Sequence, residues 1–427
     1  MRVLRGLPLR LAGAAVPPTP TVTVAPPPWP VQGLDVKAVR HAAGVRPTPF
    51  QQFVLKVHSR CNLACTYCYV YEGPDQSWRE RPRAVPEDVV DAAARRIAEH
   101  AAAHGLRDVH VNLHGGEPLL SGPGPLVRYV TAVRRAVAER TGEDACRVHV
   151  SMQTNATLLT DAVVTELADA GIKIGVSLDG GLARHNSRRV DRRGRPAWPA
   201  ATRGLRVLAR HPDTYAGILC TIDPATDPIE VYESLLEFEP PSLDLLLPHA
   251  NWSALPPSTG APAPYGEWLA AVFDQWFDAE RVRTTIRLFT EVIGLLMGLP
   301  SGTEAVGTSP VVAVVVDTDG AIEQVDSLKT TYAGAPVTGL DVFQHAFDQA
   351  LDHPGIAARQ LGLAALSAEC QECALVQVCG GGNYAHRFRT DTGFLNPSVY
   401  CTDLEHLIRH IAGRLSSAVG DARLREA

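Results

Sequence analysis

The residues that decide the fold are 53–68, FVLKVHSRCNLACTYC, in which an apolar strand leads directly into three closely spaced cysteines. Cys61, Cys65 and Cys68 place three thiols within eight residues, and soft thiolates favour iron–sulfur or zinc over hard cations. A closed zinc site needs a fourth ligand, for which His58 is the only obvious candidate nearby. Three thiolates on a four-iron cluster would instead leave one iron open for another ligand. This stretch therefore predicts a metal centre at the end of a strand.

Strands and amphipathic helices alternate after this stretch, which is typical of βαβ units and hence of a parallel sheet. Right-handed crossovers would curl six such units into an open barrel or a doubly wound sheet, and both folds bind ligands at the carboxyl ends of their strands. The predicted strands are Phe53–His58, Val109–Leu113, Arg147–Gln153, Lys173–Leu178, Ala216–Ile222 and Leu243–Pro248. The predicted helices are Glu87–His104, Pro125–Arg140, Asp161–Ala170, Pro199–His211 and Asp227–Phe238.

A second motif, His114-Gly-Gly-Glu-Pro118, follows the second predicted strand. Glycine lets the backbone approach a ligand closely, and the carboxylate of Glu117 is an acceptor for a cationic amine. Taken alone, the motif is also compatible with a turn that carries a surface carboxylate. Its place at the carboxyl end of the strand beside the cysteines favours a ligand site, and the two motifs together favour iron–sulfur over zinc.

The regular alternation stops after Pro248, and we place a domain boundary near residue 305. The sequence beyond predicts two helices, a β-hairpin and several short helices. The predicted helices are Tyr265–Glu280 and Thr284–Met297, and the hairpin joins Val311–Val316 to Ile322–Val325 through Thr318-Asp-Gly320.

The second half carries a further cysteine group, Cys370, Cys373, Cys379 and Cys401. Four thiols can close a second cluster completely. Cys146 and Cys220 lie on or beside predicted strands, and we interpret both as packed core thiols.

The two N-terminal motifs resemble those of the radical S-adenosylmethionine (SAM) superfamily, over about residues 50–413. The resemblance implies a partial (β/α)6 barrel in which Cys61, Cys65 and Cys68 hold a [4Fe–4S] cluster whose open iron chelates SAM. It also implies which residues contact SAM. Tyr67 would pack near the adenine, Gly115, Gly116, Glu117 and Pro118 would hold the amino group, and Ser177 and Arg189 would approach the carboxylate. Asn155, after the third strand, occupies a further similar position.

The second cysteine group resembles the SPASM domain of peptide-modifying radical SAM enzymes, whose seven cysteines house two auxiliary clusters. Here Asn383 stands where a further cysteine is expected after Cys379, and Val325 stands at the cysteine position of the hairpin motif G-x4-C. The missing ligands belong to one cluster and the four retained ones to the other. The resemblance therefore implies one auxiliary [4Fe–4S] cluster.

Longer stretches, among them VDTDGAIEQVDSLK and CGGGNYAHRF, are similar to FxsB-type maturases. This implies a peptide maturase that joins an aromatic ring carbon to the β-carbon of a residue two positions downstream, giving a cyclophane. The partners implied are a ribosomally made precursor peptide and a flavodoxin- or ferredoxin-type electron donor. The alternatives are a formylglycine-forming anaerobic sulfatase maturase, a thioether-forming peptide maturase and a non-catalytic metal-binding scaffold.

One acidic residue is a candidate catalytic base. Relatives that keep the hairpin cysteine often follow it with an aspartate that deprotonates the substrate, and Asp326 falls at that place although the cysteine is gone. An arene that has gained a carbon bond must lose a proton as it is oxidised, so the chemistry needs such a group. The alternative is that Asp326 only caps the hairpin exit or pairs with Lys329.

Composition limits the other function classes. Of 427 residues, 45% are hydrophobic and 20% charged, and the net charge of −6 argues against a nucleic-acid partner. No apolar run is long enough to span a membrane, and the dense cysteine groups predict a cytoplasmic metal-binding protein. Seven prolines in residues 17–30 predict a disordered tail over 1–47, followed by the barrel over 48–305 and the SPASM-like region over 306–427.

Overall fold

The computed structural model describes residues 35–426, and a single ten-stranded sheet organises them. Its strand order is β10-β9-β8-β1-β2-β3-β4-β5-β6-β7. The strands are β1 (Gln52–His58), β2 (Asp108–Gly115), β3 (Arg147–Thr154), β4 (Ile172–Ser177), β5 (Tyr215–Thr221), β6 (Ser242–Leu246), β7 (Thr285–Ile286), β8 (Ala313–Val316), β9 (Ala321–Glu323) and β10 (Val337–Asp341).

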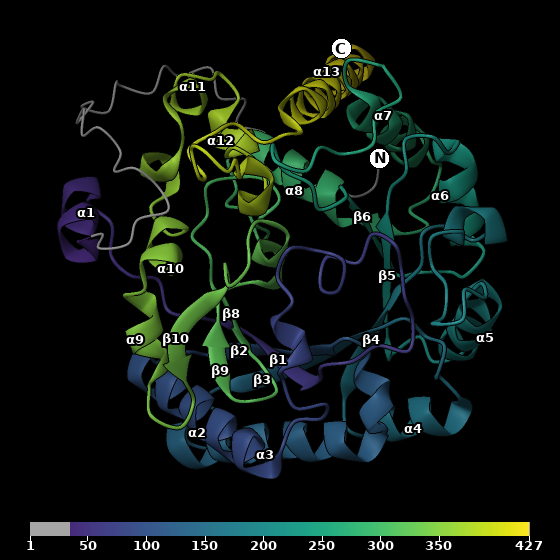
Figure 1. The fold of residues 1–427 in the computed structure, drawn as a ribbon. Coiled ribbons are helices and arrows are strands. Elements are labelled where there is room, and N and C mark those ends of the chain that lie inside the picture. The colour runs from purple at the N-terminus through teal and green to yellow at the C-terminus, as the bar shows by residue number, and fades with distance from the viewer. Residues whose placement is uncertain (1–34, 427) are drawn as a thin grey trace.

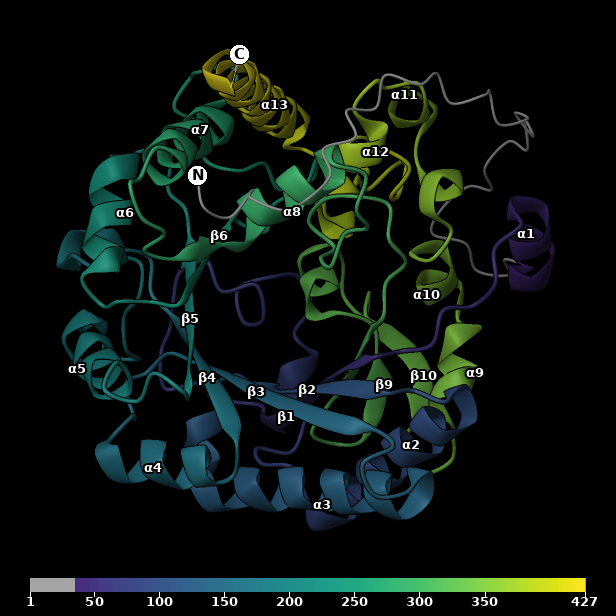
Figure 2. The same ribbon diagram turned by 180° about the vertical axis from the view of Figure 1, so that it is seen from behind.

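Strands β1 to β6 pair in parallel, each with the next along the chain, and this confirms the predicted α/β fold of six βα units. The sheet curves, and the connecting helices lie along its outer side in both views (Figures 1 and 2). Carboxyl ends of the strands therefore gather at one end of the curved sheet. These helices are α2 (Glu87–His104), α3 (Pro123–Thr141), α4 (Asp161–Asp169), α5 (Trp198–Leu208) and α6 (Pro228–Leu236).

Helix α2 shows how local sequence sets these elements. It begins after Pro86 with acidic residues Glu87 and Asp88 in its first turn, where they favour the positive end of the helix dipole. It ends at Gly105, which adopts the left-handed conformation (φ 57°) that glycine allows at a helix end. Its alanine-rich face is buried against the sheet and α3.

The predicted hairpin is confirmed as β8 and β9, but it is not separate from the barrel sheet. β8 pairs in parallel with β1, with Gln52 opposite Ala313 and Leu55 opposite Val316. β9 and β10 continue the sheet in antiparallel fashion. The boundary near residue 305 therefore marks a change of connectivity, and the sheet runs through it.

The expected tail over residues 1–47 extends too far along the chain. Val36–Ala43 form helix α1, capped by Asp35 and ended by Gly44, and Arg40 donates to Asp352 and to the carbonyl of Leu351. The prolines of residues 17–30 lie outside the described residues. Residues 36–43 thus pack on the folded part of the molecule.

Helices of the second half cover the rest of the curved sheet. The predicted helix Thr284–Met297 begins with the short edge strand β7, since the β-branched pair Thr285–Ile286 pairs with β6 before the helix starts. In the part of the chain that the structure describes, no helix is long and apolar enough to cross a membrane. The helices are α7 (Pro264–Phe277), α8 (Arg287–Leu296), α9 (Phe347–Leu351), α10 (Pro354–Ala358), α11 (Ala368–Gln371), α12 (Val376–Cys379) and α13 (Cys401–Glu426).

Candidate functional site

The loop with the first three cysteines leaves β1 at the carboxyl end of the sheet. The amide of Ala64 donates to the carbonyl of Val190 (2.7 Å), and that of Thr66 donates to the carbonyl of Arg188 (3.1 Å). These bonds tie the cysteine loop to the segment that follows β4. Residues 61–68 are therefore held in place by backbone contacts that do not involve the thiols.

The three thiols are free, and their geometry suits a cluster better than a single zinc ion. Tetrahedral zinc with bonds of about 2.3 Å would bring its sulfur ligands to about 3.8 Å from one another. Among the described residues, no three cysteine sulfurs lie within 4.8 Å of each other. No two of these sulfurs form such a group with a ring nitrogen of His58 either. Burial raises the pKa of Cys61 to about 12, so a cationic centre is needed to hold it as thiolate.

The two glycines of the second motif lie so close to neighbouring parts of the chain that no side chain fits there. A Cβ on Gly115 would lie 2.4 Å from the carbonyl oxygen of His58, and one on Gly116 would lie 1.8 Å from the hydroxyl of Tyr71 and 2.4 Å from the carbonyl oxygen of Arg60. We expected the two glycines to admit a ligand. In the structure, the space beside the two glycines is taken by the start of the cysteine loop, which packs directly on them.

The carboxylate of Glu117 also has a structural role that the sequence did not indicate. It accepts hydrogen bonds from the amide of Leu119 (3.0 Å), the hydroxyl of Thr154 (2.7 Å) and the amide of Asn155 (2.8 Å), and it is 1% exposed. Glu117 thus joins the ends of β2 and β3, and Pro118 opens the 3₁₀ turn that follows it. An amine held at this motif would meet the main chain around Gly115 and Gly116 rather than a free carboxylate.

Asn155 connects the third strand to the cysteine loop. Its side-chain nitrogen lies 3.7 Å from the sulfur of Cys61 and donates to the side-chain oxygen of Asn62 (2.9 Å). Asn155, which we expected at the site, therefore lies in contact with Cys61.

Tyr67 and Arg189 meet at a third residue, Asp179, that we had not singled out as a site residue. The Tyr67 hydroxyl donates to Asp179, and the guanidinium of Arg189 donates to the Tyr67 oxygen (2.9 Å) and lies 3.9 Å from Asp179. Arg189 is buried and close enough to Cys65 to lower its pKa, although burial dominates and raises it. Ser177, two residues before Asp179, is partly exposed. Its hydroxyl accepts a hydrogen bond from the side chain of Gln153 (2.8 Å).

Asp326 opens the 3₁₀ helix η4 (Asp326–Thr330), just after β9. It is 8% exposed and forms an ion pair with Lys56 of β1 through Oδ2, while its Oδ1 is buried without a hydrogen-bond partner. Lys329 pairs with Glu323 (3.3 Å) and Asp75 (3.7 Å) instead, and Asp326 forms no side-chain cap. Asp326 therefore forms neither a side-chain cap nor a direct ion pair with Lys329, and its direct partner is Lys56.

The charge around Asp326 keeps its carboxylate ionised. Burial acts to raise its pKa, but the ammonium groups of Lys56 and Lys329 outweigh burial, and the pKa lies below its ordinary value. Lys56 also donates to Nδ1 of His114 (3.2 Å), the first residue of the second motif. Burial lowers the pKa of His114 to about 4, so its ring is neutral and can accept this bond. Residues of β1, β2 and η4 are thus joined by one polar chain.

Aromatic and imidazole rings stand beside this carboxylate. The ring centroids of Tyr69 and His249 lie 4.9 Å apart with an angle of 66° between the ring planes, and the rings of His249 and His386 lie 5.7 Å apart. Burial lowers the pKa of His249 to about 4, and the carboxylate of Asp326 lies close enough to act against this shift. Nε2 of His386 is buried without a partner.

The second cysteine group is assembled from three short segments. Cys370 lies in α11, Cys379 at the end of α12 and Cys401 at the start of α13, with Cys373 between the first two. Their thiols lie close enough to act on one another electrostatically. Burial is the main cause that raises the pKa of Cys401 to about 11, and the charges of the other three thiols are the next. Cys146 and Cys220 are apart from both groups in the hydrophobic core, as predicted.

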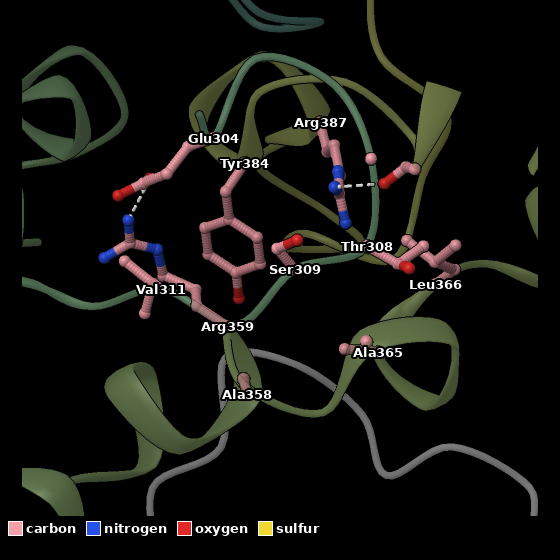
Figure 3. Close-up of a pocket in the computed structure, with 13 residues that line it drawn as sticks. Glu304, Thr308, Ser309, Val311, Ala358, Arg359, Ala365, Leu366, Tyr384 and Arg387 are labelled. Carbon is pink, nitrogen blue, oxygen red and sulfur yellow. Dashed lines mark hydrogen bonds and ion pairs between the residues drawn. The ribbon is translucent and has the colours of Figure 1, made fainter. Parts of the chain in front are cut away.

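The two positions that lack cysteine lie in a different environment. Val325 packs against a small apolar cluster that contains Tyr384, Phe388 and Phe394, and the side chain of Asn383 caps the 3₁₀ helix η6 (Tyr384–Arg387). Figure 3 shows the adjoining pocket, with a volume of about 50 Å³, in which the ring of Tyr384 lies between the guanidinium groups of Arg359 and Arg387. Neither Val325 nor Asn383 offers a thiol to a second auxiliary cluster.

This arrangement predicts the iron content of the protein. Three and four clustered cysteines would hold two [4Fe–4S] clusters, so the anaerobically reconstituted chain should contain about eight irons. Replacing Cys61, Cys65 and Cys68 together by alanine should leave about four. Iron and labile sulfide assays measure both values, and about twelve irons in the unaltered chain would contradict the prediction.

Comparisons with known proteins agree with this geometry. Residues 55–221 match the family model described as Radical SAM superfamily. The serine-type anaerobic sulfatase-maturating enzyme of Klebsiella aerogenes is 27% identical over 343 residues, which cover 80% of this chain and 81% of that enzyme. The cysteine-type anaerobic sulfatase-maturating enzyme of Clostridium perfringens strain 13 is 22% identical over 383 residues, covering 88% of this chain and all of that enzyme.

Solved structures share the fold. Native anSMEcpe with bound AdoMet and Cp18Cys peptide superposes with a TM-score of 0.72 at 20% identity, over 87% of this chain and 99% of that one. Streptococcus suis SuiB bound to the precursor peptide SuiA superposes with a TM-score of 0.57 at 14% identity, over 86% of this chain and 79% of that one. The curved sheet, the cysteine loop and the C-terminal region thus occur together in known folds.

Proposed function

We propose that this chain, whose residues 55–221 form a radical SAM domain, crosslinks a ribosomally made peptide by joining an aromatic ring carbon to a β-carbon two residues away. The observation that carries the proposal is Asp326, an ionised carboxylate whose buried Oδ1 has no hydrogen-bond partner and which lies near the rings of Tyr69 and His249. Two solved relatives are described as complexes with peptides, anSMEcpe and SuiB, which supports a peptide substrate.

The residues present fit the two cofactors of this chemistry. Cys61, Cys65 and Cys68 would hold a [4Fe–4S] cluster, and the main chain of Gly115 and Gly116 with Arg189 would hold the amino acid part of SAM. Together the bound cluster and SAM supply a carbon-centred radical that removes one hydrogen atom from the peptide. Cys370, Cys373, Cys379 and Cys401 would hold the auxiliary cluster, which would supply an acceptor for one electron.

The role we assign to this chain's own side chain is proton removal. When the peptide β-carbon has bonded to the arene, the ring carbon still carries its hydrogen, and aromaticity returns when that proton and one electron leave. Oδ1 of Asp326 has no hydrogen bond to give up, so it can take the proton at once. Lys56 holds Oδ2 and keeps the carboxylate ionised before the reaction. We assign to the neighbouring rings of Tyr69 and His249 the role of contacting the arene.

Formylglycine formation is the second candidate, favoured by the curated relatives, both of which mature sulfatases. It also removes two hydrogens from a serine residue, so the change in peptide mass alone does not separate the two reactions. The missing cysteines at positions 325 and 383 support the crosslink, since the sulfatase maturases resemble the seven-cysteine pattern. A thioether-forming reaction remains the third candidate.

A precursor peptide encoded beside this gene, coexpressed with the enzyme, tests the proposal. The product should have lost two hydrogens, fail to react with an aldehyde-specific hydrazide, and give no fragment ions between the two joined residues in tandem mass spectrometry. Hydrazide labelling would point to formylglycine, and a bond that breaks at a cysteine sulfur would point to a thioether. In purified assays dithionite can replace the flavodoxin or ferredoxin that we expect as donor.

Lys56 gives a prediction on pH dependence. Without its ammonium group the pKa of Asp326 should rise, because burial then dominates. The carboxylate would therefore be ionised only at higher pH, and the acid limb of the crosslinking pH profile should move to higher pH in Lys56→Met. Lys56→Arg keeps the charge and serves as the control. An acid limb that stays in place in Lys56→Met would show that another group sets it.

A further inference from the structure

Three potential metal ligands meet at the opposite end of the barrel from the cysteines. His100 and His104 lie one turn apart near the end of α2, and Asp348 lies in α9 of the C-terminal region. Nδ1 of His100 is 2.6 Å and Nε2 of His104 is 2.9 Å from Oδ1 of Asp348. Helices α2 and α9 lie side by side in both views (Figures 1 and 2). The trio therefore links the barrel to the region that follows it.

The donor atoms are the right kind and close enough for one cation. All three lie within 4.8 Å of one another, and they are the only such group among the described residues. Two imidazoles and a carboxylate form a common set for zinc, whose bonds of about 2.0–2.2 Å would separate its ligand atoms by about 3.3 Å. The two observed contacts need to open by less than an ångström. The side chain of Asp348 is 48% exposed and free to make that adjustment.

The surroundings hold one ligand firmly and leave the site open to solvent. The ring of His100 is almost fully buried among Phe50, Phe53 and Phe347, with ring centroids 5.8–6.1 Å away. Burial lowers the pKa of His100, so its ring is neutral, which is the form that binds metal. His104 and Asp348 face solvent, which gives a cation an entry path and a water molecule as fourth ligand.

We propose that His100, His104 and Asp348 form a site for a divalent transition cation of the zinc type, separate from both cysteine groups. The site does not depend on the proposed peptide chemistry. It lies where α2 leads into the amino-terminal end of β2, far from the strand ends that carry the cysteines. A bound cation would connect α2 to α9, and it would stabilise the folded chain by an amount that grows with the logarithm of the cation concentration divided by its Kd.

The test uses the full, tag-free chain with its iron–sulfur clusters reconstituted. After treatment with a mild chelator, the protein is dialysed against zinc and its metals are measured by mass spectrometry. We expect about one zinc per chain, a raised unfolding temperature and unchanged iron. His104→Ala and Asp348→Asn should lose the zinc and the rise in temperature while keeping their iron.

His149→Ala is the matched control. His149 is also an exposed histidine paired with a carboxylate, Asp108 (2.8 Å), but this pair has no third ligand in the set found here. Its zinc content should equal that of the unaltered chain. Absence of zinc from the unaltered chain, or zinc retained in both His104→Ala and Asp348→Asn, would overturn the proposal and leave the trio as a hydrogen-bonded contact only.

Discussion

Asp326→Asn should lower the rate of peptide crosslinking by roughly 10²–10⁴-fold, the usual range for loss of a general base. The substitution keeps the shape of the side chain and removes its ability to take a proton. Formation of 5′-deoxyadenosine should continue, since it precedes the step that needs the base. Chromatography of the same reaction mixture for deoxyadenosine and for cyclic peptide measures both events.

This prediction needs controls, because the substitution leaves the buried ammonium group of Lys56 without its partner. Without its carboxylate partner the ammonium of Lys56 is unpaired, and such a loss can destabilise a protein by about 3–5 kcal/mol. Iron content and unfolding temperature therefore need to accompany the kinetics. Asp391→Asn, at an exposed ion pair with Arg389, should change none of these values. Cyclic peptide formed by Asp326→Asn at the unaltered rate would mean that the base is another residue.

Replacing Cys61, Cys65 and Cys68 together by alanine should abolish 5′-deoxyadenosine formation altogether. These thiols are the only ones at the carboxyl end of β1, and no histidine or carboxylate groups with them in the described residues. The reaction is followed anaerobically with dithionite and SAM. Cys146→Ala, at a buried cysteine outside both groups, is the control and should stay active. Equal deoxyadenosine from the triple variant would remove the basis for the proposed chemistry.

The fold followed from the sequence where each element carries its own signal. Helix α2 begins and ends as predicted, because Pro86 and Gly105 bound its apolar face. Strands β1 to β6 were predicted because each is a short apolar run between helices. The pairing of β8 with β1 was not predicted, since no local pattern states which distant strand lies beside an edge. Helix α1 was missed because its eight residues follow a proline-rich segment.

The site was predicted only in part, for a related reason. The cysteines and the second motif can be recognised from their spacing in the sequence. Whether Lys56 and Asp179 belong to the site depends on the direction in which their strand or loop faces, which the sequence does not state. Lys56 stands in the middle of an apolar strand, and this charge in a buried sheet was the available signal. Asp179 lies two residues after Ser177. One of its partners, Tyr67, is 112 residues away in sequence, and the other, Arg189, lies on the far side of a loop.

The parallel pairing of β1 with β8 has a consequence for synthesis on the ribosome. Strand β1 can pair with β2 early in synthesis. Its other edge, which pairs with β8, stays unpaired until residue 316 has been made. For that interval the nascent chain exposes the backbone of an apolar strand, the feature that promotes aggregation of unfinished chains. Residues 48–305 produced alone would keep this edge permanently, so the chain is best expressed whole. Chaperone demand during translation should be high for the same reason.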